Sequence, residues 1–233
     1  MKYVVLDPGH GGKDPGASGY GIYEKNVVLD LAKRVNTHLG AYEDVAVSLT
    51  RWDDRFIELS DRAKFANDRN ADLFVSLHNN AASASAHGFE SFVYTSASSA
   101  SRKYQDVVHS HLMAYLKNYG ITDRGKKSAN YAVVRETKMP AMLIEYLFIT
   151  NSKENSLLKD SNFLDGLAKA TAEGIAAALG LKKKSNKPEP PYRVVVDGVE
   201  KVWTAYDSKV LDAVADAIKD NRAKNIQIER IDG

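Results

Sequence analysis

The chain of 233 residues contains no cysteine. This absence excludes a disulfide framework, a thiolate metal site and a cysteine nucleophile, so any metal must be held by His, Asp or Glu. An excess of charge of one sign is also lacking, because 32 basic and 30 acidic residues give a formal net charge of +2. A net charge this small creates no strong electrostatic field around the protein. We therefore expect no nucleic-acid partner and no attraction to an anionic membrane through net charge.

Long hydrophobic runs are missing as well. No apolar segment approaches the roughly 18 residues that a membrane-spanning helix needs. The first residues, MKYVVLD, lead directly into a predicted strand, without the apolar segment and small-residue cleavage site of a signal peptide. We expect synthesis in the cytoplasm, so that action outside the cell would require release by another protein.

Proline is scarce, and three of the six prolines lie in one segment, KKKSNKPEPP (182–191). The segment has four lysines and no apolar side chain, so it cannot bury surface, and we interpret it as a solvated linker. It separates a domain at 1–181, which is long enough for its own core, from a small segment at 192–233.

Strand-like and helix-like segments alternate before the linker. Helices are expected at 24–40, 58–70, 98–119 and 163–180, and strands at 2–7, 45–51, 71–78, 88–95, 131–136 and 141–146. The alternation predicts an α/β fold: a twisted, mostly parallel sheet with helices on both faces. In such sheets, functional sites lie at the carboxyl ends of the strands.

The segment after the linker predicts a small ββαβ module. Its expected elements are strands at 192–196 and 199–203 around an Asp197-Gly198 turn, a helix at 208–221 and a strand at 225–230. Because a segment of about 40 residues is near the lower limit for independent folding, we expect it to dock on a partner surface or to dimerise.

Two histidines and one glutamate stand at the ends of predicted elements. His10 follows the first strand in DPGHGGKDPGA (7–17), Glu24 opens a helix, and His78 ends a strand. All three are expected on one rim of the sheet, and two imidazoles with one carboxylate are a common ligand set for catalytic zinc. The glycines let the chain turn sharply and leave room for a substrate to approach the backbone. Each residue alone also fits a structural role, such as a core histidine or a glutamate at a helix start.

Glu145 interrupts an apolar strand, between Ile144 and Tyr146. Burial of an unpaired carboxylate is costly and raises its pKa. One interpretation is a general base beside water activated by a metal. The other is a glutamate that faces solvent at a strand end, and the residues alone leave both open.

Four segments in this order resemble the zinc-dependent N-acetylmuramoyl-L-alanine amidases of the amidase-3 type. They are DPGHGGKDPGA (7–17), the helix start at Glu24, SLHNNA (76–81) and YAVVRETKMPAMLIEYLFITN (131–151). The resemblance implies His10, Glu24 and His78 as ligands of one Zn²⁺ and Glu145 as the catalytic carboxylate. It implies hydrolysis, in peptidoglycan, of the amide between the lactyl group of N-acetylmuramic acid and L-alanine of the stem peptide.

Three more residues are candidates for substrate binding. Arg124 lies in an Asp-Arg-Gly segment that also matches the family, and arginine binds carboxylates well; the alternative is a surface ion pair. Asn79 and Asn80 could hydrogen-bond the substrate or orient the metal ligands. The Leu59-x-x-Arg62 pattern of the family is assigned to packing and to orienting the strand of His78.

The C-terminal segment resembles the cell-wall-attachment modules of phage endolysins. This implies an endolysin that binds a wall polymer through 192–233 and stays in the cytoplasm until a holin opens the membrane. A lytic amidase of the sporulating mother cell fits the same observations. A zinc peptidase that cuts within the stem peptide and a non-enzymatic wall-binding protein are further alternatives, and the intact site residues argue against the last.

Overall fold

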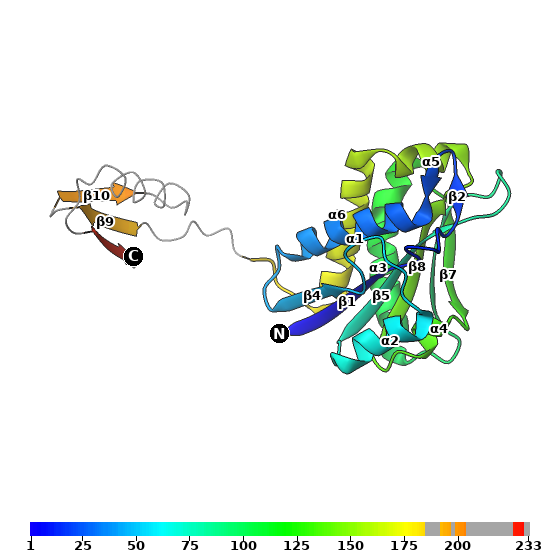
Figure 1. Ribbon diagram of the computed structural model, residues 1–233, viewed down its shortest axis with the longest axis horizontal. Coiled ribbons are helices and arrows are strands. Elements are labelled where there is room, and N and C mark those ends of the chain that lie inside the picture. The colour runs from blue at the N-terminus through cyan, green and yellow to red at the C-terminus, as the bar shows by residue number, and fades with distance from the viewer. Residues whose placement is uncertain (185–191, 197–198, 204–225, 231–233) are drawn as a thin grey trace. The chain divides into compact units, whose positions relative to one another are not determined.

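The computed structural model describes residues 1–184, 192–196, 199–203 and 226–230 (Figure 1). The chain divides into two compact units, Met1–Lys184 and Ser185–Gly233, which are described separately. Among the described residues, no helix combines the length and the apolar character that crossing a membrane requires.

Six strands form the main sheet of the first unit, in the spatial order β4-β1-β5-β8-β6-β7. Their bounds are β1 Lys2–Pro8, β4 Val45–Leu49, β5 Leu73–Asn80, β6 Phe89–Tyr94, β7 Asp123–Ala129 and β8 Ala141–Phe148. β4, β1, β5 and β8 are parallel, whereas β6 and β7 run together in the opposite direction. A short hairpin, β2 (Ser18–Gly19) and β3 (Ile22–Tyr23), lies between β1 and the first helix.

Helices cover both faces of this sheet (Figure 1). The larger core lies under α1 (Glu24–Leu39), α3 (Ser99–Leu116) and α6 (Ser161–Leu179), and the smaller core lies under α2 (Leu59–Asp68) and α4 (Ala132–Arg135). The other helices described in the first unit are α5 (Ser152–Leu158) and the 3-10 helix η1 (Lys117–Tyr119). The predicted mostly parallel α/β sheet with helices on both faces is thus confirmed.

Strand β5 shows how the sequence positions the site. Val75 and Leu77 enter the larger core and Phe74 the smaller one, since side chains alternate along a strand. His78 follows at the carboxyl end, on the face that Phe74 occupies. Burial on both sides also explains why the first part of this strand, residues 73–77, is apolar except for Ser76.

The predicted strand at 131–136 is wrong. Ala132–Arg135 form α4, and the strand is Asp123–Ala129 (β7), whose sequence is DRGKKSA. β7 is the last strand of the sheet and is largely exposed, so it needs no apolar alternation and carries the charges that protect an edge.

Three strands of the second unit are described: β9 Tyr192–Val196, β10 Val199–Trp203 and β11 Ile226–Arg230. They form an antiparallel sheet in the order β10-β9-β11, which confirms the predicted strands. The predicted turn at 197–198 and helix at 208–221 lie outside the described residues.

Candidate active site

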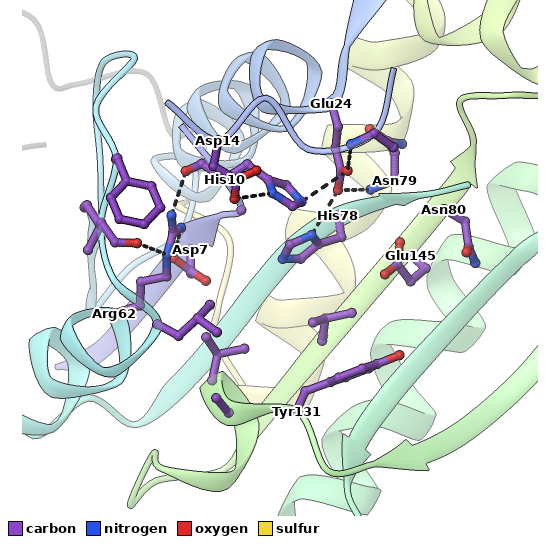
Figure 2. Close-up of a pocket in the computed structure, with 18 of the residues that line it drawn as sticks. Asp7, His10, Asp14, Glu24, Arg62, His78, Asn79, Asn80, Tyr131 and Glu145 are labelled. Carbon is purple, nitrogen blue, oxygen red and sulfur yellow. Dashed lines mark hydrogen bonds and ion pairs between the residues drawn. The ribbon is translucent and has the colours of Figure 1, made fainter. Parts of the chain in front are cut away.

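A cavity of about 610 Å³ opens at the carboxyl ends of β1 and β5, beside β8 (Figure 2). Its polar lining includes His10, Glu24, His78 and Glu145. The opposite walls are largely apolar and come from the loop before α2, from α4 and from β8; they include Phe56, Ile57, Leu59, Ala132, Val133 and Leu143. The cavity therefore pairs a cluster of titratable groups with apolar walls, as small-molecule sites commonly do.

The turn after β1 presents His10 in a left-handed conformation, with φ at 60°. The Nε2 atom of His10 lies 3.1 Å from Oε2 of Glu24, and its Nδ1 lies 2.8 Å from Oδ2 of Asp14. Burial lowers the pKa of His10, but the hydrogen bonds and charges of Glu24 and Asp14 outweigh it and raise the pKa. Asp14 thus fixes the ring orientation from the side away from Glu24.

Glu24 is the first residue of α1 and is 3% exposed. Its Oε1 lies 2.9 Å from Nδ1 of His78 and accepts the backbone N–H of Asn79, while Oε2 accepts the backbone N–H of Ala17. Burial raises the pKa of Glu24, but the hydrogen bonds from His10 and His78 outweigh it and hold the pKa far below its usual range. The carboxylate is therefore charged at neutral pH.

These three residues form a group that could hold a metal ion. One ligand atom from each of His10, Glu24 and His78 lies within 4.8 Å of the other two, and the two imidazole rings are 4.9 Å apart, edge to face. Two nitrogens and one carboxylate oxygen match the ligands of zinc better than those of calcium or magnesium, which take mainly oxygen. The structure brings the predicted set together on one rim of the sheet.

The glycines of the first loop make room for the imidazoles. A Cβ atom at Gly9 would lie 2.2 Å from Cε1 of His78, and one at Gly16 would lie 2.6 Å from Cδ2 of His10. We expected these glycines to clear space for a substrate. At these two positions the space is filled by the histidine side chains themselves.

Glu145 lies on β8 in register with His78, and Figure 2 shows it beside that imidazole. Burial raises its pKa to about 7, although the charge of His78 opposes the shift. Its Oε2 atom is enclosed and accepts no hydrogen bond from any described residue. A carboxyl group with a pKa near neutrality can both take up and return a proton at physiological pH.

The three predicted substrate contacts lie in different surroundings. Asn79 is buried, and Figure 2 shows its side chain directed away from Glu145. Asn80 lines the cavity and donates a hydrogen bond of 2.6 Å to Oε1 of Glu90. The Nε atom of Arg124 donates to Oε2 of Glu90 at 3.1 Å, so the ion pair considered as its alternative role is present.

Glu90 and Lys127 belong to this polar group and were not expected from the sequence. Glu90 is directly opposite Glu145 across the β6–β8 ladder, and Lys127 binds the same Oε2 as Arg124. Arg124, Lys127 and Glu90 together carry one excess positive charge, and Asn80, which binds Glu90, connects this group to the cavity. No sequence signal links these residues, because they meet only through the pairing of three strands.

Residues 4–177 match the family model Amidase_3, described as N-acetylmuramoyl-L-alanine amidase. The endolysin of Bacillus phage SPP1 is 51% identical over 191 residues, which cover 81% of this chain and 70% of that protein. The sporulation-specific N-acetylmuramoyl-L-alanine amidase of Bacillus subtilis (strain 168) is 39% identical over 216 residues, covering 92% of this chain and 82% of that protein.

Solved structures show the same fold. The catalytic domain of CwlV, an N-acetylmuramoyl-L-alanine amidase from Bacillus (Paenibacillus) polymyxa var. colistinus, superposes with a TM-score of 0.74 at 39% identity. The match covers 78% of this chain and all of that domain. The match of 216 residues to the sporulation amidase is longer than the unit Met1–Lys184, so that similarity extends into the second unit.

Proposed function

This chain belongs to the N-acetylmuramoyl-L-alanine amidase family and has that enzymatic activity on peptidoglycan, and we propose that it acts through one Zn²⁺ ion and Glu145. The bond cleaved would be the amide between the lactyl group of N-acetylmuramic acid and L-alanine of the stem peptide. The observation that carries the proposal is the convergence of His10, Glu24 and His78 beside a carboxyl group whose pKa is about 7.

His10, Glu24 and His78 would hold the metal. Zinc, when bound, lowers the pKa of a water ligand to roughly 7 and polarises a carbonyl group. Asp14 holds His10 from outside the ligand set, and the backbone N–H of Asn79 holds Glu24. On this proposal, Asn79 would position Glu24 through its main chain, which is one of the two roles that the sequence leaves open for it.

Glu145 would carry the proton through the reaction. It takes a proton from the water whose oxygen attacks the carbonyl carbon of the lactyl amide. The carbon–nitrogen bond then breaks, and Glu145 returns the proton to the nitrogen of L-alanine, which leaves as an amine. The lactyl group is released as a carboxylic acid and loses its remaining proton to solvent, so that it ends as a carboxylate. The apolar surroundings that raise the pKa of Glu145 make it suited to both transfers.

The two sides of the cavity suit two parts of this substrate. The apolar wall that includes Ile57 and Val133 would receive the methyl groups of the lactyl unit and of L-alanine. Asn80, Arg124 and Lys127 would face the stem peptide beyond the cleaved bond, where free carboxylates favour a positively charged rim. A zinc peptidase that cuts within the stem peptide would use the same metal site, and the family membership favours the amidase.

The biological setting that we propose is lysis of a bacterial wall by an endolysin, after release by a holin. Similarity to the phage endolysin supports it. Residues 192–233 would bind a wall polymer, which raises the local concentration of the catalytic unit, or would join two chains as a homodimer. A sporulation mother-cell amidase is the second candidate, because similarity to the sporulation-specific enzyme extends beyond the first unit.

Two variants test the assignment of roles. Glu145→Ala should lose wall lysis while it keeps zinc at one ion per chain. His10→Ala should lose the zinc, and His38→Ala is its control, because His38 pairs with Asp165 outside the cavity. Unchanged lysis by Glu145→Ala would exclude the proposed base. Full zinc content in His10→Ala would exclude the proposed ligand set.

A further inference from the structure

Two arginines are buried beneath the turn that presents His10. Arg51 and Arg62 are each 2% exposed, although arginine is rarely buried without a partner. Neither belongs to the proposed ligands or to the proposed base. Their surroundings show what they bind.

Arg51 binds four backbone carbonyl groups. Its Nε donates to the carbonyl of Pro8 at 3.0 Å, and its Nη2 donates to those of Gly9 at 2.7 Å and Lys25 at 2.8 Å. Its Nη1 donates to the carbonyl of Asp53 at 3.1 Å. One guanidinium group therefore joins the turn after β1, the first turn of α1 and the loop after β4.

Arg62 binds the same turn from α2. Its Nη1 donates to Oδ1 of Asp7 at 2.9 Å and to the carbonyl of Pro8 at 2.8 Å, and its Nη2 donates to the carbonyl of His10 at 2.6 Å. Its Nε donates to the carbonyl of Ile57 at 3.0 Å. Figure 2 shows Arg62 beside Asp7, where both are labelled. We expected Arg62 to orient the strand of His78. Its direct contacts are with the turn of His10, and Asp7 connects it to that strand by accepting a hydrogen bond from Ser76.

Together the two side chains donate hydrogen bonds to three consecutive carbonyl groups, those of residues 8, 9 and 10. The chain here needs fixing, because His10, Gly11 and Gly12 all have positive φ and glycine keeps much conformational freedom. The contact with Lys25 fixes the residue that follows Glu24 to the same guanidinium group. The backbone segment that carries His10 and the one that carries Glu24 are thereby held at a fixed distance from each other.

We propose that Arg51 and Arg62 are positioning residues that set the metal affinity of the site by holding His10 and Glu24 in the geometry of the bound state. This inference rests on the metal role given to these two residues above. Mutation of residues outside the ligand set commonly weakens metal affinity 10- to 100-fold. We expect loss of the four hydrogen bonds donated by Arg51 to weaken zinc affinity by a factor in that range.

Arg51 is the better residue to test. Among the described residues no carboxylate lies within ion-pair distance of Arg51, so its removal breaks no ion pair. Removal of Arg62, by contrast, would leave the buried Asp7 carboxylate without its ion-pair partner. Arg51→Met keeps most of the volume and removes every donor. Arg51→Lys keeps the charge, but one ammonium group cannot reach four carbonyls. The control is Gln105→Met, since Gln105 is also buried and bridges two carbonyls, those of Ser91 and Lys127, away from the metal ligands.

The experiment measures the Kd for zinc by competition with a fluorescent chelator, and the absorption spectrum of bound Co²⁺, which reports ligand geometry. The melting temperature of each metal-free variant is recorded beside them. We expect both Arg51 variants to bind zinc about 10- to 100-fold more weakly, with an altered Co²⁺ spectrum, at a temperature where they are folded. Gln105→Met should keep the wild-type Kd and spectrum even if its melting temperature falls.

The wild-type protein separates the two claims. Failure of the wild type to bind zinc would overturn the proposed function and this inference with it. Zinc binding by the wild type, together with an unchanged Kd in Arg51→Lys, would overturn the inference and leave the proposed function standing. Arg51→Lys supplies that comparison even if Arg51→Met does not fold.

Discussion

Glu145→Gln should stabilise the metal-free protein at alkaline pH while it abolishes amide hydrolysis. Burial raises the pKa of the Glu145 carboxyl from 4.5 to about 7, so the folded protein favours the neutral acid. The stability that this preference contributes is complete below pH 4.5 and is lost as the pH rises through 7. Glutamine has nearly the same shape and stays neutral throughout, so the variant should escape this loss.

The magnitude follows from the two pKa values. A difference of about 2.5, at about 1.36 kcal/mol for each pKa unit, corresponds to at most about 3 kcal/mol at pH 9. For a domain of this size, that free energy corresponds to a rise of about 6–12 °C in melting temperature. Bound zinc would reduce the gain, because a nearby cation favours the charged carboxylate.

The assay is thermal unfolding of the metal-free wild type and variant at pH 5 and pH 9, with wall lysis measured in parallel. Glu173→Gln is the control, because Glu173 lies on α6 outside the cavity and pairs only with Lys183 among the described residues. The reasoning would be refuted if Glu145→Gln were no more stable than wild type at pH 9, or if its advantage were the same at pH 5.

Three further changes have defined outcomes. Gly9→Ala should lose most of its bound zinc, measured by elemental analysis, because the new Cβ would displace the ring of His78; full zinc content would show that the ring can move and still bind. Asp14→Ala should weaken zinc binding by about 10-fold, measured by chelator competition, because His10 loses its outer partner; an unchanged Kd would assign Asp14 to loop structure alone. Arg124→Ala should raise KM for soluble muropeptides and leave kcat almost unchanged; an unchanged KM would show that Arg124 forms its ion pair with Glu90 and does not bind the substrate.

The sequence predicts the buried part of the fold well, because burial leaves a pattern. The strand of Phe74 and the helix ending at Leu39 have the apolar spacing that their cores require. The charged strand β7 carries no such pattern, since one edge of it pairs with nothing in the sheet and most of its side chains are exposed. The neighbouring apolar residues of α4, such as Val133 and Val134, resemble a strand in sequence. The helix has only four residues, which are too few to show a helical period.

The residues of the site likewise include some that the sequence indicates and some that it does not. The clustering of His10, Glu24 and His78 could be predicted, because each lies at or near the end of a strand or helix on one side of the sheet. Arg51 could not, because it opens the segment RWDDR, in which four of five residues are charged, as is typical of an exposed loop. Its burial depends on carbonyl groups contributed by the turn after β1 and by α1. Contacts of that kind are set by tertiary structure and leave no local signal.

The central claim is tested most directly by mass spectrometry of the fragments released from purified Bacillus-type peptidoglycan, with and without a chelator. The account predicts free stem peptides that begin at L-alanine beside intact glycan, lost on chelation and restored by zinc. Muropeptides that remain joined to sugar but are cut within the stem would contradict it and identify a zinc peptidase. Release of the same stem peptides in the presence of the chelator would contradict the metal site.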